Sequence, residues 1–303
     1  MDLVAVADRL PIAGETMTGN RFFSEPGGKG ANQAFAAARL GGDVAFFGRV
    51  GTDEFGAAMY ANLESVGCDV SGLRQVAGRS GVAVILVSSA GQNSIVVVPG
   101  ANQFYRPADV VADAPAFAGA AFALLQLEIP MDTVIAAAME AKKQGARVVL
   151  DPAPAPHSLS PELCRHIDIL TPNESEAAQL VNGRPGPLSE KEGMDVAGQL
   201  QRLGVSTVII KLGERGCLLA EAGNMTFVPA PPVSAVDSTG AGDVFNAALT
   251  VACSRGFSLL EGCKFAVRAA ALSVTRLGAQ HGMPSTEEID AFYDAKSTAH
   301  KCG

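Results

Sequence analysis

The sequence predicts an α/β fold built on a mostly parallel sheet with helices on both faces. Short apolar runs rich in Val, Ile and Leu recur along the chain, as is typical of strands buried on both faces. Helical segments lie between these runs, and several of them end at a glycine, the usual residue just beyond a helix C-terminus. Such alternation implies parallel strands joined by crossover helices.

The expected elements follow in chain order. Strands are predicted at residues 44–50, 121–127, 147–150, 167–170 and 207–211. Helices are predicted at residues 31–40, 54–66, 131–144 and 196–203, which stop at Gly41, Gly67, Gly145 and Gly204. We expect a single domain over residues 1–303, because the chain contains no low-complexity stretch and no repeat with a period of about 20–50 residues.

Two segments depart from this pattern. Residues 3–9 with 15–23, and residues 81–88 with 94–98, alternate apolar and polar side chains across glycine-containing turns. This alternation predicts antiparallel hairpins with one solvated face. We interpret segments of about 3–23 and 81–100 as a small sheet that projects from the domain as a lid, and an ordinary extension of the sheet edge is the alternative.

Composition excludes several classes of function. The net charge is −8, and no basic stripe of the kind that binds nucleic acid is visible. No apolar run approaches the roughly 20 residues that cross a membrane, and we expect a soluble, cytoplasmic protein. The six cysteines, at 68, 164, 217, 253, 263 and 302, form no CxxC pair, so we expect idle thiols rather than a zinc site.

A glycine-rich stretch, EPGGKGANQAFAAARLGG, runs from Glu25 to Gly42. Adjacent glycines allow a ligand to approach the backbone closely, and a helix is expected to begin at about Gly30. Lys29 and Asn32 lie three residues apart and can share one face of that helix start. These groups supply many hydrogen-bond donors, which suits a polyhydroxyl ligand or a phosphate, whereas a tight turn with a surface lysine is the alternative.

Polar residues follow several of the predicted strands. Glu128 ends the strand in LLQLEIP, where ligands of open α/β sheets bind, and it could accept sugar hydroxyl protons or be a solvated strand end. Asn173 and Glu176 begin a helix in ILTPNESEA. They could support a magnesium ion that keeps most of its waters, or Asn173 could simply cap the helix.

Two further stretches suggest phosphate chemistry. In IIKLGERGCLL, a strand ending at Lys211 enters a turn with Gly213 and Gly216 that could rest against a planar or phosphate group. In VDSTGAGDVFNAAL, residues 240–242 offer unhindered N–H groups at a helix start, followed by Asp243. The Asp243 carboxylate could take a proton from an attacking hydroxyl, or it could only complement the helix dipole.

These motifs resemble those of the PfkB carbohydrate kinases. VDSTGAGDVFNAAL is similar to the C-terminal signature of that family, DTxGAGD, and PGGKGANQAFAAARLGG is similar to the N-terminal signature. Within the family the wording is closest to the ribokinases, through QLEIP, DPAPAP, LTPNESE and VTRLGAQ. The resemblance is colinear from about residue 2 to residue 293, which is nearly the whole chain.

The resemblance implies a three-layer α/β/α domain with a small β-sheet lid, and ATP-dependent phosphorylation of D-ribose at its 5-hydroxyl. It also implies a homodimer in which the lids of two subunits clasp each other. Asp243 would be the general base, with Gly240, Ala241 and Gly242 as the anion hole for the γ-phosphate. The sugar contacts would be Asp2, Gly28, Lys29, Asn32, Glu128 and Asp243.

The same resemblance implies the nucleotide and cation sites. ATP would contact Asn173, Lys211, Gly213 and Gly216, and Glu176 would hold Mg²⁺ through water. Potassium, an activator of ribokinases, would be held mostly by backbone carbonyls of a set comprising Asp237, Thr239, Ser273, Arg276 and Gly278. The chain reads GAQHGMPS after this set, with Gly282 where related sequences often carry Ser.

The resemblance also leaves two questions open. The family begins with an apolar strand that ends in a Gly-x-x-Asn-x-Asp pattern, and Asp2 matches its final Asp, so we expect that first strand to be missing from this chain. The substrate could instead be deoxyribose, fructose, an aldonate or a nucleoside such as adenosine, since few contacts distinguish one hydroxyl. A non-catalytic sugar-binding protein on the same scaffold is the alternative from another class.

Overall fold

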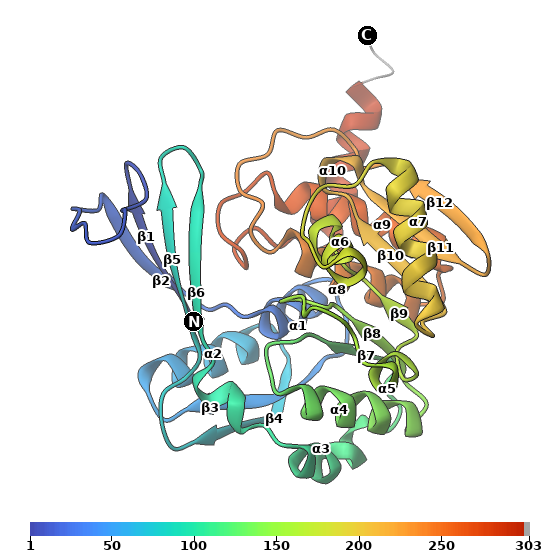
Figure 1. Cartoon of the computed structure of the whole chain (residues 1–303), viewed down its shortest axis with the longest axis horizontal. Coiled ribbons are helices and arrows are strands. Elements are labelled where there is room, and N and C mark those ends of the chain that lie inside the picture. Colours follow the sequence, from blue (N-terminus) through green and yellow to red (C-terminus); the bar gives the residue numbers. More distant parts are fainter. Residues whose placement is uncertain (300–303) are drawn as a thin grey trace.

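The computed structural model describes residues 1–299, with side chains through Asp294. Its centre is a six-stranded sheet in the order β12-β11-β10-β9-β8-β7 (Figure 1). Four of its strands are parallel: β7 (Phe122–Leu125), β8 (Arg147–Leu150), β9 (Ile169–Leu170) and β10 (Thr207–Lys211). The antiparallel strands β11 (Cys217–Glu221) and β12 (Asn224–Val228) complete one side.

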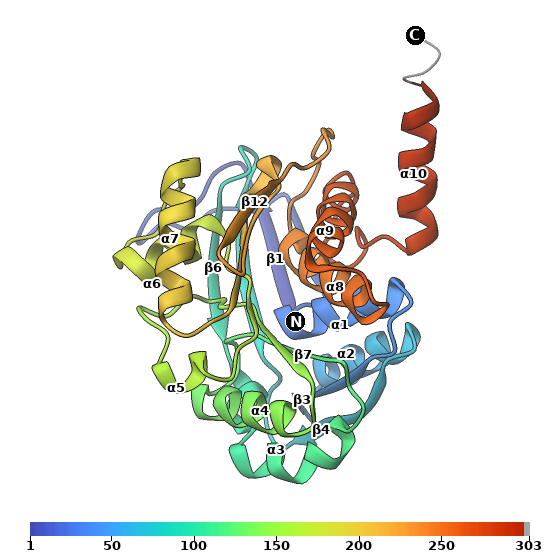
Figure 2. The ribbon, with the colours of Figure 1, turned by 90° about the vertical axis from the view of Figure 1, so that its right-hand side faces the viewer.

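Helices cover both faces of this sheet, as the apolar strands predict (Figure 2). One face packs under α4 (Met131–Lys143), α5 (Pro161–Cys164), α6 (Glu174–Asn182) and α7 (Glu190–Arg202). The other packs under α1 (Lys29–Arg39), α8 (Ala241–Ser254), α9 (Leu259–Ser273) and the first part of α10 (Thr286–Ala299). Neighbouring strand residues such as Ile209 and Ile210 enter opposite cores, so the three-layer prediction is confirmed.

A separate two-stranded sheet completes the body. Strands β3 (Ala45–Gly51) and β4 (Asp69–Val76) pair in parallel through the crossover helix α2 (Glu54–Ser65). The chain later passes through η1 (Gly100–Phe104), α3 (Pro107–Asp113) and η2 (Ala114–Phe117). Within the described residues β7 pairs only with β8, and β3 pairs only with β4. The body therefore has two separate sheets, and α1 packs against both β3 and β7.

The two predicted hairpins form one four-stranded sheet, which projects from the body (Figure 1). Its order is β2 (Arg21–Glu25), β1 (Asp2–Ala7), β5 (Val82–Ser88) and β6 (Asn93–Val98). The outer pairs are antiparallel, and β1 and β5 join them in parallel. The prediction of a strand at 15–20 is wrong, because Glu15 bonds Arg9 and the Ile12 N–H within a loop.

Three smaller expectations can be compared with the structure. Cys68, Cys164, Cys217, Cys253 and Cys263 are free thiols, and Cys302 lies outside the described residues. No helix over residues 1–299 is both long and apolar enough to span a bilayer. The strand predicted at 121–127 ends at Leu125, because Gln126 and Glu128 turn out of the ladder toward α1.

Candidate active site

Asp243 lies in the first turn of α8, where the structure buries it. Gly240 begins this helix in the left-handed conformation (φ 75°), which a residue with a Cβ adopts only at a cost. The Asp243 side chain is only 6% exposed. Its two oxygens accept hydrogen bonds from α1: Oδ2 from Asn32 Nδ2 at 3.0 Å, and Oδ1 from Gln33 Nε2 at 3.1 Å. The carboxylate is thus held at a helix N-terminus by two amides.

A second buried carboxylate shares one of these amides. Gln33 Nε2 also donates to Asp151 Oδ2 at 3.0 Å, so it bridges Asp151 and Asp243. Gln126 Nε2 donates to Gln33 Oε1 at 2.6 Å and thereby fixes which end of the Gln33 amide faces the acids. Lys211 Nζ donates to Asp151 Oδ1 at 3.0 Å. The network ties the ends of β7, β8 and β10 to Asp243.

The environment of Asp243 raises the pKa of its carboxyl to about 6. Burial is the largest cause, because it disfavours the charged form. The Lys29 ammonium lowers the pKa, the charge of Asp151 raises it, and the bonds from Asn32 and Gln33 lower it. A carboxylate tuned toward neutrality can accept a proton near physiological pH.

On the N-terminal side of α1, the predicted sugar residues gather around the glycine pair. Gly28 is the N-cap of α1, and the Lys29 N–H donates to Glu128 Oε2 at 2.8 Å. The Asp2 carboxylate lies directly against the backbone of Gly27. Burial is the largest cause of the raised pKa of both Asp2 and Glu128. Donors and acceptors alternate here, as a polyhydroxyl ligand requires.

Lys29 connects this region with the rest of the site. Burial would lower the pKa of its ammonium, but attraction to Asp243, Asp151, Glu128 and Glu176 outweighs burial and raises it. The ammonium therefore stays charged among carboxylates from four different segments. The Lys29 ammonium could therefore neutralise part of the charge of a negatively charged group bound in this site.

The start of α6 at Asn173 lies next to Lys211, which belongs to the Asp243 network. Asn173 Oδ1 accepts from the Glu176 N–H, and Glu176 Oε2 accepts from the Asn173 N–H, both at 2.8 Å. This reciprocal cap confirms the capping role, which the sequence left as one of two alternatives. Asn173 also forms a bridge to Lys211 of β10, so α6 begins beside the end of that strand.

The glycine turn after β10 lies close to the anion-hole residues. Lys211 Nζ lies beside Gly242, which brings the end of β10 against the start of α8. Gly216 has φ 95° and ψ −123°, and a Cβ there would overlap the carbonyl oxygen of Val228. Gly213, in the same turn, has open space around it. Lys211, at the start of this turn, therefore joins the turn to the Asp243 network.

The predicted cation residues lie in two segments that meet, one before α8 and one at and after the end of α9. Asp237 Oδ1 accepts from the Thr239 N–H and hydroxyl, and Oδ2 accepts from the Gly278 N–H at 2.9 Å. The carbonyl oxygens of Ser273 and Gly278 both lie close to Gly282. The Arg276 guanidinium instead pairs with Glu288 at 3.0 Å, so Arg276 can offer only its backbone. No group of three His, Cys, Asp or Glu residues suited to a metal occurs within the described chain.

Several residues of this site carried no role in the sequence prediction. Gln33, Gln126 and Asp151 complete the Asp243 network, and Gln280 extends it through Asn32. All four stand inside quoted motifs: Gln33 in GGKGANQ, Gln126 in QLEIP, Asp151 in DPAPAP and Gln280 in VTRLGAQ. That position was the available signal. Their partners come from distant segments, which only the fold brings together.

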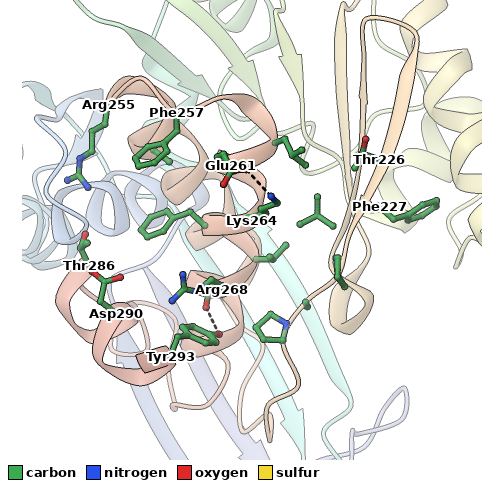
Figure 3. A pocket seen from close by; sticks show the side chains of 18 residues that line it. Thr226, Phe227, Arg255, Phe257, Glu261, Lys264, Arg268, Thr286, Asp290 and Tyr293 are labelled. Atoms are coloured by element: carbon green, nitrogen blue, oxygen red, sulfur yellow. Dashed lines mark hydrogen bonds and ion pairs between the residues drawn. The ribbon is translucent and has the colours of Figure 1, made fainter. Parts of the chain in front are cut away.

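A cavity of about 880 Å³ lies elsewhere, between β12, α9, α10 and the C-terminal end of α8 (Figure 3). Phe227, Phe257 and Tyr293 line it, together with Lys264 and Arg268. Its cations already have partners, since Lys264 pairs with Glu261 and Arg268 lies over the Tyr293 ring at 4.3 Å. None of the predicted site residues lines this cavity, so it is separate from the Asp243 site.

Comparison with known proteins identifies the family. Residues 1–286 match the pfkB family carbohydrate kinase. The ribokinase of Bacillus subtilis is 39% identical over 290 residues, covering 96% of this chain and 95% of that protein. The deoxyribokinase of Salmonella typhi is 35% identical, covering 96% and 95%. The structure of Arabidopsis thaliana ribokinase complexed with ribose and ATP is similar with a TM-score of 0.86 at 35% identity, covering 96% of this chain and 94% of that one. The chain therefore belongs to the PfkB family of carbohydrate kinases.

Proposed function

We propose that this protein is a cytoplasmic ribokinase, which transfers the γ-phosphoryl group of ATP to the 5-hydroxyl of D-ribose. The observation that carries the proposal is the Asp243 carboxylate, buried at the start of α8 and held by Asn32 and Gln33. Relatives named ribokinase, 39% identical over nearly the whole chain, support ribose as the substrate. The deoxyribokinase relative, at 35% identity, supports deoxyribose as the second candidate.

In the proposed reaction, the sugar lies against Gly28, Lys29 and Glu128 with its 5-hydroxyl at Asp243. Asp243 takes the hydroxyl proton as the oxygen attacks the γ-phosphorus, and the bond from phosphorus to the bridging oxygen of ADP breaks. The N–H groups of residues 240–242 would stabilise the charge on the transferring phosphoryl oxygens, and the Ala241 N–H would exchange its bond to the Ser238 carbonyl oxygen for one to the phosphoryl group. The Lys29 ammonium lies close enough to supply further positive charge. The nucleotide lies along the turn of Lys211, Gly213 and Gly216, beside Asn173.

Two cations belong to this proposal. The Asn173–Glu176 cap uses one Glu176 oxygen, which suits a Mg²⁺ ion held through water on the phosphates of ATP. The Ser273 and Gly278 carbonyls, which converge at Gly282 near Asp237, form an oxygen-rich loop that suits potassium. Bound Mg²⁺ would neutralise phosphate charge, and potassium would order the segment that leads into Gly240.

The test is a coupled measurement of ADP release with D-ribose, deoxyribose, fructose, an aldonate and nucleosides, each with and without potassium. We expect D-ribose to give the highest kcat/KM, and we expect potassium to raise it. Preference for another sugar would reassign the substrate while leaving the kinase chemistry in place. Absence of turnover on every acceptor would favour the non-catalytic, sugar-binding alternative.

The pKa of Asp243 predicts a pH dependence of activity. The raised folded-state pKa, about 6, means that the carboxylate is protonated and unable to act as base below that pH. We therefore expect kcat/KM for ribose to fall roughly tenfold per pH unit below about 6 and to level off above it. A pH profile of kcat/KM measures this limb. A limb near pH 4 would mean that burial does not tune this group.

We further propose that the four-stranded sheet is a lid over the sugar and the surface through which two subunits form a homodimer. β1 begins at Asp2 in the sugar region. Cross-strand partners place Val84 and Val96 on one face of this sheet, and Val98 and Phe22 follow on the same face. These side chains are 42–68% exposed, which is unusual for a contiguous apolar face and typical of an interface.

Replacing Val96 by Lys tests this surface, because the substitution places a charge on the apolar face at its edge strand, β6. We expect the variant to sediment as a monomer where the unmodified protein is a dimer, with an increased KM for ribose if the partner supports the lid. Val111→Lys, at an exposed apolar position on α3, is the matched control. A monomeric unmodified protein, or a Val96→Lys variant that remains dimeric, would contradict this interface.

A further inference from the structure

A chain of three carboxamides leads to Asp243 from the loop that follows α9. Asn62 Nδ2, on α2, donates to Gln280 Oε1 at 2.6 Å. Gln280 Nε2 donates in turn to Asn32 Oδ1 at 3.0 Å. Asn32 Nδ2 then donates to Asp243 Oδ2 at 3.0 Å. Gln280 and Asn32 are each 6% exposed, so water is a poor substitute for these bonds.

The bonds of this chain all run in the same direction, which gives each amide one permitted orientation. A carboxamide has a donor end and an acceptor end, and the two are similar in size and shape. If the Asn32 amide turned over, its oxygen would face the Asp243 carboxylate and its NH₂ group would face the NH₂ group of Gln280. Both contacts would then be repulsive in a buried setting, where unsatisfied polar groups are costly.

We propose that Gln280 is a positioning residue, which holds the Asn32 amide with its NH₂ group toward the Asp243 carboxylate and so keeps Asp243 able to accept the substrate proton. This inference rests on the proposed function, in which Asp243 is the base. Gln280 makes no recorded bond to Asp243, and it acts through Asn32. With Oδ1 occupied by Gln280, one N–H of Asn32 serves Asp243 and the second remains available to a sugar hydroxyl.

The other charged groups that face Asp243 come from separate elements. Lys29 begins α1, Asp151 follows β8, and Lys211 ends β10 and bonds Asp151. Gln280 contacts none of the three in the recorded bonds, so a change at position 280 leaves their arrangement in place. A shift in the titration of Asp243 can then be assigned to the Asn32 amide.

Gln280→Glu reverses only one end of the residue. The oxygen that accepts from Asn62 is retained, and the NH₂ group that faces Asn32 becomes an acceptor. When the new carboxyl is ionised, the Asn32 amide turns over and presents its oxygen to Asp243. We expect the acid limb of kcat/KM to move upward by about one pH unit, because a hydrogen bond to the charged form is lost. Activity well above the limb should change much less.

A double-mutant cycle separates this relay from a direct effect of the new charge. Asn32→Ala should by itself move the acid limb of kcat/KM to higher pH. Adding Gln280→Glu to Asn32→Ala should move the limb no further. A through-space effect of the carboxylate would persist in the double variant and would overturn the proposal. Gln75→Glu, at an exposed position on β4, is the control for the charge change and should leave the limb where it is.

Gln280→Met provides a second test that adds no charge, and it applies also if the Glu variant fails to fold. It removes the donor to Asn32 at similar volume, and we expect an upward shift smaller than that of Gln280→Glu. Lower thermal stability with an unmoved limb in both variants would overturn the proposal, since a structural role alone predicts that result. Failure of the unmodified protein to phosphorylate any sugar would instead count against the proposed function.

Discussion

Replacing Asp243 by Ala is expected to lower kcat for ribose phosphorylation roughly 10²- to 10⁴-fold, with a modest change in sugar affinity. The physical reason is that Asp243 is the carboxylate in the first turn of α8, so the substitution removes the proposed acceptor of the hydroxyl proton. The sugar contacts at Gly28, Lys29 and Glu128 are retained in the variant. Single-turnover kinetics would give the rate, and calorimetry with ribose would give the affinity.

Asp243→Asn is the matched variant, because it keeps the volume of the buried side chain and removes its basicity. The Ala variant leaves the amides of Asn32 and Gln33 without an acceptor, so its loss of stability must be measured separately by thermal unfolding. We expect the two variants to lose similar activity although they differ in stability. Near-normal turnover in either variant would remove Asp243 from the role of base.

Gly216→Ala is expected to lower the free energy of unfolding by about 3–4 kcal/mol and to raise the KM for ATP. The backbone of Gly216, at φ 95° and ψ −123°, is in a region that only glycine adopts readily. A Cβ there would also overlap the Val228 carbonyl oxygen, so the β10–β11 turn must move away from β12. Urea unfolding and ATP-dependent kinetics would measure the two effects.

Gly213→Ala is the control within the same turn. Gly213 also has a positive φ, 58°, but this is the ordinary left-handed region, and its missing Cβ would meet open space. We expect this variant to lose only about 1–2 kcal/mol of stability. Equal losses at Gly213 and Gly216 would contradict the additional cost assigned to the Gly216 backbone and its contact with Val228.

The sequence predicted those parts of the site that depend on local pattern. Asp243 at a helix start, Lys29 and Asn32 on one helix face, and Glu128 at a strand end all follow from short motifs, and the structure brings them into one region. The alternation of buried strands and helices likewise predicted both cores. In each case the signal lies within a few residues, where periodicity and helix-terminal chemistry operate.

Other parts depended on contacts between distant segments. Gln33 bridges Asp151 and Asp243, which are separated from it by 118 and 210 residues, and nothing near Gln33 in the sequence shows this. Gln280 reaches Asn32 across 248 residues. The start of β2 at Arg21 was missed because the preceding alternation is a loop held by Arg9 and Glu15. The pattern of apolar and polar residues within a segment does not show which distant segment it will contact in the fold.

The division of the body into two sheets has a consequence for how the protein opens. No ladder hydrogen bond joins β7 to β3 in the described chain, so the β3–β4 unit can separate without breaking the larger sheet. Helix α1 packs on both units, and it carries Lys29, Asn32 and Gln33. The residues of α1 that are proposed to face the substrate therefore lie at the boundary between the two sheets. Partial opening of the β3–β4 sheet would displace these residues and abolish activity before the protein as a whole unfolds.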